Sequence, residues 1–148
     1  MREALRYTVG RDREGERLDR FLREALPDLP VRSVTFAIGA GDVFVERERA
    51  KKGRILRAGE AVMVRRIADR EDWLPAAGDL PGAGVLFEDA DVAVLNKPAD
   101  AHTEPHRPRE PGTLAGYLLF RHPSVIEISR EPGLTLLTRL DYATSGAV

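Results

Sequence analysis

The sequence contains no cysteine, and this absence excludes two kinds of architecture. Without thiols the chain forms neither a disulfide framework nor a thiolate metal site. Aromatic residues are also few, at 6% of the 148 residues. The absence of cysteine agrees with a protein that works in a reducing compartment.

Long hydrophobic runs are missing as well. No segment approaches the roughly 18 consecutive apolar residues that a membrane-spanning helix needs. The segment Met1–Tyr7 has no apolar core of the kind that a signal peptide carries. We therefore expect no membrane insertion, no secretion and a cytoplasmic location. With 43% hydrophobic and 32% charged residues, the composition is that of one or two small globular domains.

The formal net charge of −1 conceals an uneven distribution along the chain. Residues 1–66 contain 16 Lys and Arg against 11 Asp and Glu, a net of +5, whereas residues 67–148 carry a net of −6. A basic module is typical of a protein that meets a polyanion such as nucleic acid. A solvated charged surface is the alternative that charge alone leaves open.

The first half of the chain has the pattern of a small α+β module. Apolar alternation predicts a short strand over Leu5–Val9, and apolar spacing of three and four residues predicts a helix over Leu18–Leu26. A second helix is expected over Val31–Ala40, followed by strands at Val43–Val45 and Ala61–Arg65. Two helices packed on a small sheet is the resulting expectation.

Residues 68–84 are rich in proline and glycine and show no helical or strand period, which predicts a linker. Within it, Trp73 is expected to dock the linker onto a domain, with base stacking as the alternative. A β-hairpin is predicted next, with strands at 85–87 and 92–95. Thr113 is the expected cap of a short helix that follows it.

The loop between the hairpin and this helix contains His102 and His106 on either side of Glu104. Such spacing binds a metal convincingly on a helix, but Pro105 and Pro108 prevent a helix here. We therefore expect no metal site in this loop.

The last stretch is an apolar run, Leu134–Leu140, that leads into a turn of small residues. If the run is a strand, Arg139 and Asp141 leave it on the same face, and the guanidinium favours the ionised form of the carboxylate. An ionised aspartate is suited to nucleophilic attack. A surface ion pair is the alternative, because the same tripeptide recurs at Arg17–Asp19, where it fits an ordinary amphipathic helix.

The longer string Arg139-Leu-Asp-x-x-Thr-Ser-Gly146 resembles the catalytic motif of pseudouridine synthases of the large-ribosomal-subunit (Rlu) type. The string Glu88-Asp-x-Asp-Val-x-Val-Leu-Asn-Lys-Pro98 stands upstream of it, in the order found in that family. The resemblance implies isomerisation of uridine to pseudouridine in rRNA or tRNA, without cofactor or metal.

By the same resemblance Asp141 is the nucleophile, and Arg139 fills the space that the extruded base leaves. The residues that the resemblance assigns to the shaping of the cleft are Asn96, Lys97, Thr144, Ser145 and Gly146. The chain departs from the family pattern at three positions, namely Thr138, Asp100 and Glu104.

Residues Gly15–Arg66 resemble the alpha-L RNA-binding module that precedes the catalytic domain in many such enzymes. By position, the resemblance nominates six basic residues as contacts to the RNA backbone: Arg32, Arg47, Arg49, Lys51, Lys52 and Arg54. Two departures bear on RNA affinity, since Asp42 replaces a basic residue and Glu46–Arg49 replaces an Asn-Gly turn.

The sequence thus predicts an α+β protein with an RNA-binding domain at 1–67, a linker at 68–84 and an incomplete catalytic domain at 85–148, built on a mixed, mainly antiparallel sheet. RNA is the expected partner. Because catalytic domains of the family extend well beyond the motif, we expect little isomerase activity from these 148 residues alone. The competing hypothesis is a non-catalytic RNA-binding protein that keeps the module and a remnant of the enzyme.

Overall fold

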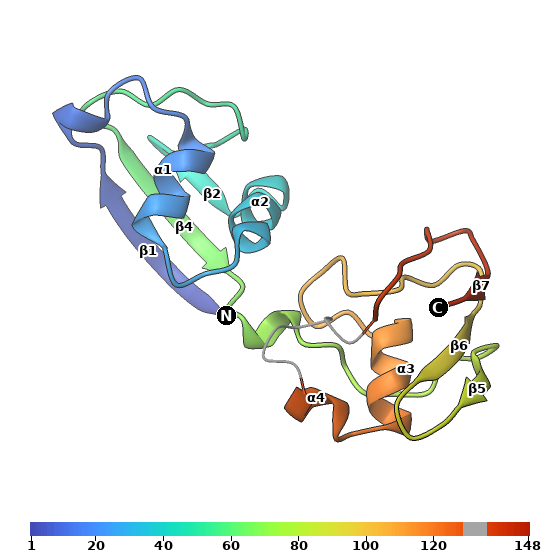
Figure 1. Cartoon of the computed structure of the whole chain (residues 1–148). Coiled ribbons are helices and arrows are strands. Elements are labelled where there is room, and N and C mark those ends of the chain that lie inside the picture. The colour runs from blue at the N-terminus through green and yellow to red at the C-terminus, as the bar shows by residue number, and fades with distance from the viewer. Residues whose placement is uncertain (129–135) are drawn as a thin grey trace. The chain divides into compact units, whose positions relative to one another are not determined.

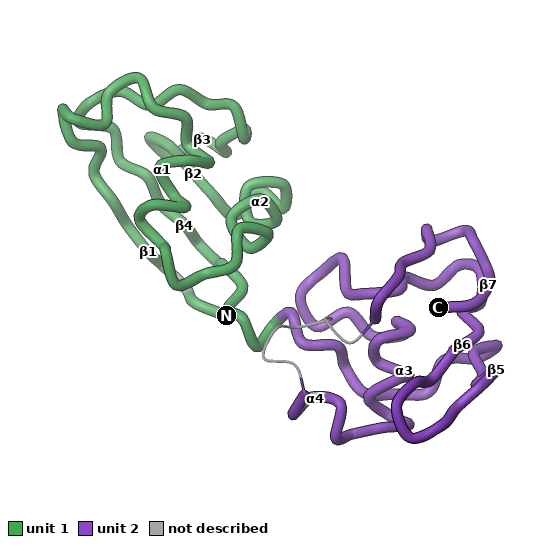
Figure 2. Tube along the Cα trace, in the orientation of Figure 1, with its two compact units in different colours: residues 1–72 green, residues 73–148 purple. Residues whose placement is uncertain are grey.

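The computed structural model describes residues 1–128 and 136–148. The chain divides into two compact units, Met1–Asp72 (unit 1) and Trp73–Val148 (unit 2), which are coloured separately in Figure 2. Each unit has its own hydrophobic core.

Unit 1 is a four-stranded antiparallel sheet covered by two helices (Figure 1). Its strand order is β1-β4-β2-β3. The strands are β1 (Arg2–Thr8), β2 (Val43–Val45), β3 (Glu48–Arg49) and β4 (Ala61–Ile67), and the helices are α1 (Leu18–Ala25) and α2 (Val31–Gly39). A 3-10 turn, η1 (Arg11–Arg13), joins β1 to α1. The predicted strands and helices of this half are confirmed.

The core of unit 1 forms where the apolar faces of α1 and α2 meet the sheet. Leu18 and Leu22 of α1 and Val64 of β4 are completely buried, and Val34 of α2 is 1% exposed. Burying each such aliphatic side chain stabilises the fold by about 1.5–3 kcal/mol. The spacing of three and four residues in the helices is therefore what fixes them to this sheet.

The β2–β3 hairpin is closed by Glu46 and Arg47. Both residues have positive φ angles, 49° and 74°. Two positive φ angles in a two-residue loop are the geometry of a type I′ turn, which favours Asn and Gly because other residues are strained there. The hairpin therefore keeps two non-glycine residues in this geometry and places the basic side chain of Arg47 at its tip.

Unit 2 contains a three-stranded antiparallel sheet in the order β5-β6-β7. The elements are β5 (Gly84–Glu88), β6 (Ala93–Lys97), α3 (Leu114–Arg121), α4 (Val125–Ile128) and β7 (Gly146–Ala147). Leu114 of α3 and Leu95 of β6 belong to the same buried cluster. Thr113 caps α3 as predicted, since its side-chain oxygen accepts a hydrogen bond from the Gly116 amide at 3.1 Å.

The predicted linker contains the boundary between the units and one 3-10 turn, η2 (Glu71–Trp73). Trp73 is 2% exposed, which confirms that it docks into the structure. The backbone then passes α3 so closely that a Cβ atom added to Gly116 would lie 2.3 Å from the carbonyl oxygen of Ala76. Only glycine permits this approach, so the part of the predicted linker after Asp72 is packed within unit 2.

The predicted strand over Leu134–Leu140 is wrong in its described part. Residues 136–140 form neither helix nor strand, and residues 134 and 135 lie outside the described residues. The α+β class is confirmed, whereas every described strand pairing in unit 2 is antiparallel, so no mixed sheet is seen there. Among the described residues no helix has the length and apolar character to cross a bilayer.

Candidate functional site

Strand β7 joins the two motifs that the sequence places 40 to 50 residues apart. Gly146 pairs with Lys97 and Ala147 pairs with Asn96 in antiparallel register. The amide and carbonyl of Leu95 exchange hydrogen bonds with those of Val148, at 2.8 and 2.9 Å. The turn that follows Asp141 is thereby fastened beside the end of β6.

Lys97 lies at the centre of this junction and is completely buried. Its ammonium group donates hydrogen bonds to the carbonyl oxygens of Pro98 (2.8 Å), Ala101 (2.6 Å) and Tyr142 (3.3 Å). Three donors are thus matched by three acceptors, which is how a buried charge is tolerated. Lys97 is therefore not a solvated surface lysine, and its side chain links the loop after β6 to the turn after Asp141.

Opposing effects act on the charge of Lys97. Burial lowers the pKa of the Lys97 ammonium below its ordinary value, while the carboxylates of Asp100 and Asp141 act in the opposite direction. Burial therefore outweighs both carboxylates in its effect on the pKa of Lys97.

Arg139 has a different neighbour from the one expected. Its Nη1 lies 3.9 Å from Oε2 of Glu104, and its side chain is 70% exposed. Since residues 136–140 do not form a strand, strand alternation does not place Arg139 and Asp141 on one face. Among the described residues no ion pair joins these two side chains.

The segment around Asp141 is nevertheless held by specific hydrogen bonds. The hydroxyl of Thr103 donates to the Leu140 carbonyl at 2.8 Å and lies 3.1 Å from the Leu140 amide. The Thr144 amide donates to the carbonyl of Asp141 at 3.0 Å, which closes a tight turn. Asp141 itself is exposed at the start of this turn.

The remaining residues proposed to shape the cleft occupy this turn and its anchor. Thr144 and Ser145 are exposed, and Gly146 has a φ of 151°. Asn96 donates from its side-chain amide to the carbonyl of Gly82 at 3.2 Å. The structure therefore brings these residues to one end of the β5-β6-β7 sheet.

A group of ring side chains beside Asp141 escaped sequence analysis. His102 stacks on His106, with ring centroids 4.3 Å apart, and contacts the ring of Tyr142 at 4.8 Å. Nδ1 of His102 lies 2.9 Å from Oε1 of Glu110. The histidines were considered only as metal ligands. Tyr142, the residue after the predicted nucleophile, was the available signal that a ring would lie here.

Most of the proposed RNA contacts of unit 1 are exposed. Arg47, Arg49, Lys51, Lys52 and Arg54 lie on the surface of the β2–β3 hairpin and the loop after it. Arg32 is only half-buried, and Arg54 is ion-paired to Glu60 at 2.6 Å. Asp42, one of the departures from the module, is paired with Arg65 at 2.8 Å.

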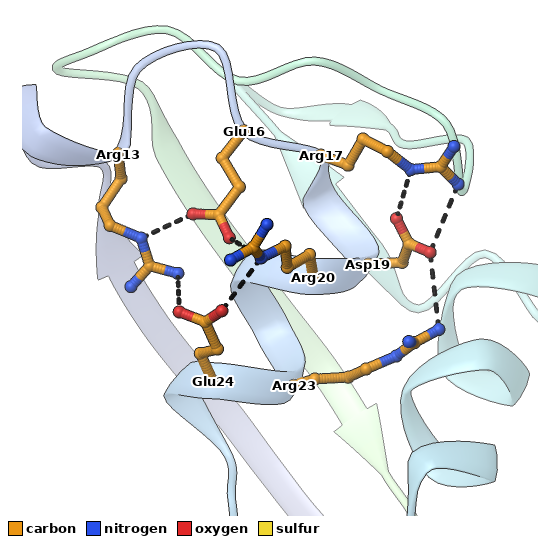
Figure 3. Close-up of polar contacts among 7 residues, drawn as sticks. All are labelled: Arg13, Glu16, Arg17, Asp19, Arg20, Arg23 and Glu24. Atoms are coloured by element: carbon orange, nitrogen blue, oxygen red, sulfur yellow. Dashed lines mark hydrogen bonds and ion pairs between the residues drawn. The ribbon is translucent and has the colours of Figure 1, made fainter.

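The arginines of α1 and η1 differ from those of the hairpin because acidic partners surround them (Figure 3). Glu24 receives Arg13 at 2.8 Å and Arg20 at 3.0 Å, while Asp19 receives Arg17 at 3.0 Å. Within the described part of the chain, no ion pair involves Arg47, Arg49, Lys51 or Lys52, the four residues named here the hairpin cations. Cations without partners remain available to phosphate, so the hairpin is the candidate nucleic-acid surface.

Comparison with known proteins shows which proteins this chain resembles. No protein-family model matches the chain. The ribosomal large subunit pseudouridine synthase D of Xanthomonas campestris is 34% identical over 134 residues, which covers 90% of this chain and 39% of that protein. The corresponding enzyme of Salmonella typhimurium is 30% identical over 146 residues, covering 98% of this chain and 43% of that protein.

A third relative carries a less specific name. An uncharacterized RNA pseudouridine synthase of Aquifex aeolicus is 31% identical over 147 residues, covering 99% of this chain and 45% of that protein. Over nearly its whole length the chain is therefore similar to the amino-terminal part of Rlu-type pseudouridine synthases. It spans less than half the length of these three relatives.

Proposed function

We propose that the protein is an RNA pseudouridine synthase that isomerises uridine in RNA, with Asp141 as the nucleophile. The observation that carries the proposal is the pairing of β7 with β6, which fixes the Asp141 turn beside Asn96 and Lys97. Homology over 90% or more of the chain supports it.

In this proposal the carboxylate of Asp141 acts on the uridine after the base leaves the stack. The bond between N1 of uracil and C1′ of ribose breaks, through attack at C1′ or through a glycal. The base then rotates and C5 bonds to C1′, which displaces the Asp141 ester or, on the glycal path, is accompanied by return of a proton to C2′. The C5 proton is lost and N1 gains a proton. Base extrusion costs a few kcal/mol, and an exposed guanidinium such as that of Arg139 is suited to fill the vacated space.

The exposure of both side chains fits this proposal. A nucleophile and an intercalating cation have to be reachable by RNA, and Asp141 and Arg139 both lie on the surface of unit 2. Lys97 acts as a positioning residue in this proposal, since its ammonium binds the carbonyl of the residue after Asp141.

Unit 1 supplies RNA affinity in the proposal. The hairpin cations have no acidic partner within the described residues, and the net charge of residues 1–66 is +5. Two of the three relatives described above are named for the large ribosomal subunit. We therefore favour rRNA of the large subunit over tRNA as the substrate.

The test of catalysis uses the protein expressed from its complete reading frame. Large-subunit rRNA and tRNA, each tritiated at C5 of uracil, are compared as substrates. Tritium release from rRNA is the expected result. We propose that the 148 residues alone release little tritium, since they span less than half the length of the relatives. No release from either RNA by the complete protein contradicts the proposal.

A second candidate is a non-catalytic RNA-binding protein, which the exposed hairpin cations of unit 1 support without any role for Asp141. A titration of RNA with residues 1–66 tests RNA binding by unit 1 separately from catalysis by the complete protein. Both candidates predict binding that weakens steeply with salt. Binding without tritium release supports the second candidate, and affinity that is absent at low salt or insensitive to salt contradicts the role of unit 1 in both.

A further inference from the structure

A depression of about 390 Å³ lies beside Asp141 in unit 2, within the size range of small-molecule sites, about 300–1,000 Å³. Its lining includes Asp100, His102, Arg107, Glu110, Gly112 and Tyr142. Tyr142 is 49% exposed, so its ring is open to a ligand. The residue next to the proposed nucleophile therefore forms part of the wall.

The wall is held rigidly by Glu110. One oxygen of this carboxylate lies 2.9 Å from Nδ1 of His102, and the other accepts the amides of His106 (2.6 Å) and Arg107 (3.1 Å). Burial alone would raise the pKa of Glu110, but these hydrogen bonds together hold the pKa below its ordinary value. Glu110 thus holds the stacked rings of His102 and His106 in place, and His102 in turn contacts the ring of Tyr142.

Asp100 contributes the second carboxylate under backbone strain. Its φ is 59°, in the left-handed region that non-glycine residues rarely adopt. Such strain gathers at functional sites, where a side chain compensates for its conformational cost. Glycine would satisfy this backbone without strain, so the carboxylate is the feature that glycine could not supply.

We propose that this depression is a subsite for an unpaired nucleobase with an exocyclic amino group, next to the target nucleotide in the RNA. The base stacks on Tyr142, and Asp100 accepts a hydrogen bond from the amino group. This inference rests on the proposed function, because the target nucleotide is placed at Asp141. It adds a residue-level source of sequence preference.

The chemistry of the lining favours an amino-bearing base over other parts of RNA. The lining sets the carboxylates of Asp100 and Glu110 against the single guanidinium of Arg107, a charge balance that disfavours phosphate. Aromatic rings, in contrast, bind the face of any base. A carboxylate accepts from the amino group of cytosine, as it does in base readout of DNA. Uracil offers only N3–H between two carbonyl oxygens, which repel the carboxylate.

The experiment uses cytidine and uridine as matched probes, since they differ in the 4-amino group and the protonation of N3. Each nucleoside is titrated into the 148-residue chain while the ring signals of His102, His106 and Tyr142 are followed by NMR. We expect saturable shifts with cytidine and binding of uridine about fivefold weaker, the effect of one net hydrogen bond. Equal binding of the two, or no shift at Tyr142, overturns the proposal.

Variants assign the preference to individual groups. Asp100→Gly should remove the difference between the nucleosides without loss of fold, and Tyr142→Ala should weaken both by about tenfold or more, the contribution of base stacking. Asp91→Gly, which removes an exposed carboxylate from the β5–β6 turn, is the matched control and should change neither affinity. A preference for cytidine that survives Asp100→Gly contradicts the role of Asp100.

The outcome is independent of catalysis because no bond is broken. If cytidine fails to bind but the complete protein releases tritium, the subsite is wrong and the proposed function stands. If cytidine binds as expected but the complete protein releases none, the proposed function fails and the pocket remains a nucleobase site.

Discussion

The same tripeptide occurs once in each unit, and the two copies have different environments. Arg17-Leu18-Asp19 begins α1, where Asp19 is 6% exposed and bound by Arg17 at 3.0 Å. Arg139-Leu140-Asp141 lies in irregular chain, where Asp141 is exposed and the Arg139 ion pair is formed with Glu104. The same three residues thus form an internal ion pair in unit 1, whereas in unit 2 the side chains of Arg139 and Asp141 are both exposed and not paired with each other.

The difference shows what turns a charged pair into a candidate site. In α1 both charges are satisfied within the helix, because Arg23 also lies 3.5 Å from Asp19. In unit 2 the backbone of Leu140 is held by Thr103, which leaves the side chains on either side unpaired with each other. The carboxylate of Asp141 is therefore accessible to a ligand, whereas that of Asp19 is buried in its ion pairs.

The largest expected effect comes from Lys97→Met, which removes the buried cation of unit 2. Three carbonyl oxygens lose their shared donor, at about 1–3 kcal/mol for each unsatisfied group. We expect unit 2 to lose about 3 kcal/mol or more of unfolding free energy, while unit 1 is unchanged. Native-state hydrogen exchange resolves the two units.

Lys52→Met is the control for this prediction, because Lys52 is exposed. Similar exchange rates for both variants would show that the buried ammonium contributes nothing to the fold.

The next effect separates the two aspartates by stability. Asp19→Asn should cost unit 1 about 1–2 kcal/mol, since two arginines lose a charged partner. Asp141→Asn should change the stability of unit 2 by less than about 0.5 kcal/mol, as for exposed positions. Thermal unfolding and hydrogen exchange measure both changes, and equal losses would remove the distinction between the tripeptides.

Lowering the pH should reduce the stability of unit 1 through Asp19. The hydrogen bond from Arg17 holds the pKa of Asp19 below its ordinary value of about 4, despite the opposing effect of burial. Unfolded chains therefore bind more protons than folded ones between the lowered pKa and about 4, and stability falls as the pH falls through this window. Unit 1 should lose stability below about pH 5, and Asp19→Asn should reduce that loss. A pH series of unfolding curves measures the slope.

A smaller effect, of opposite sign, is expected at the hairpin. Arg47 has a φ of 74°, so Arg47→Gly should stabilise unit 1 by about 1 kcal/mol. The same change removes one hairpin cation, and the slope of log affinity for RNA against log salt should fall by about 0.7–0.9. A variant that becomes more stable and keeps the full salt slope would exclude Arg47 from the RNA contact.

Sequence analysis predicted the helices that are specified by patterns within a few neighbouring residues. The helices of unit 1 follow from the spacing of Leu18 and Leu22, and α3 follows from the Thr113 cap. The strand expected before Arg139 was wrong because apolar residues alone do not form one without a neighbouring strand. The described part is instead held by Thr103, whose contact to Leu140 spans 37 positions.

The site was predictable as a set of residues but not as a set of contacts. The motifs named Lys97 and Asp141, yet burial of Lys97 under three carbonyls depends on the path of the loop after β6. The His102–His106 stack likewise depends on Glu110, eight residues from His102, which no local pattern connects to it.

Asp141 is proposed as the nucleophile, whereas Asp19, which has the same two residues before it in sequence, has only a structural role in unit 1. The decisive measurement is tritium release from C5-labelled rRNA by the complete protein carrying Asp141→Asn or Asp19→Asn, assayed at a temperature where both remain folded. The amide of asparagine is far less nucleophilic than a carboxylate, so Asp141→Asn should abolish release and Asp19→Asn should retain it near the unmodified rate. Release by the Asp141→Asn protein near the unmodified rate would contradict the assignment.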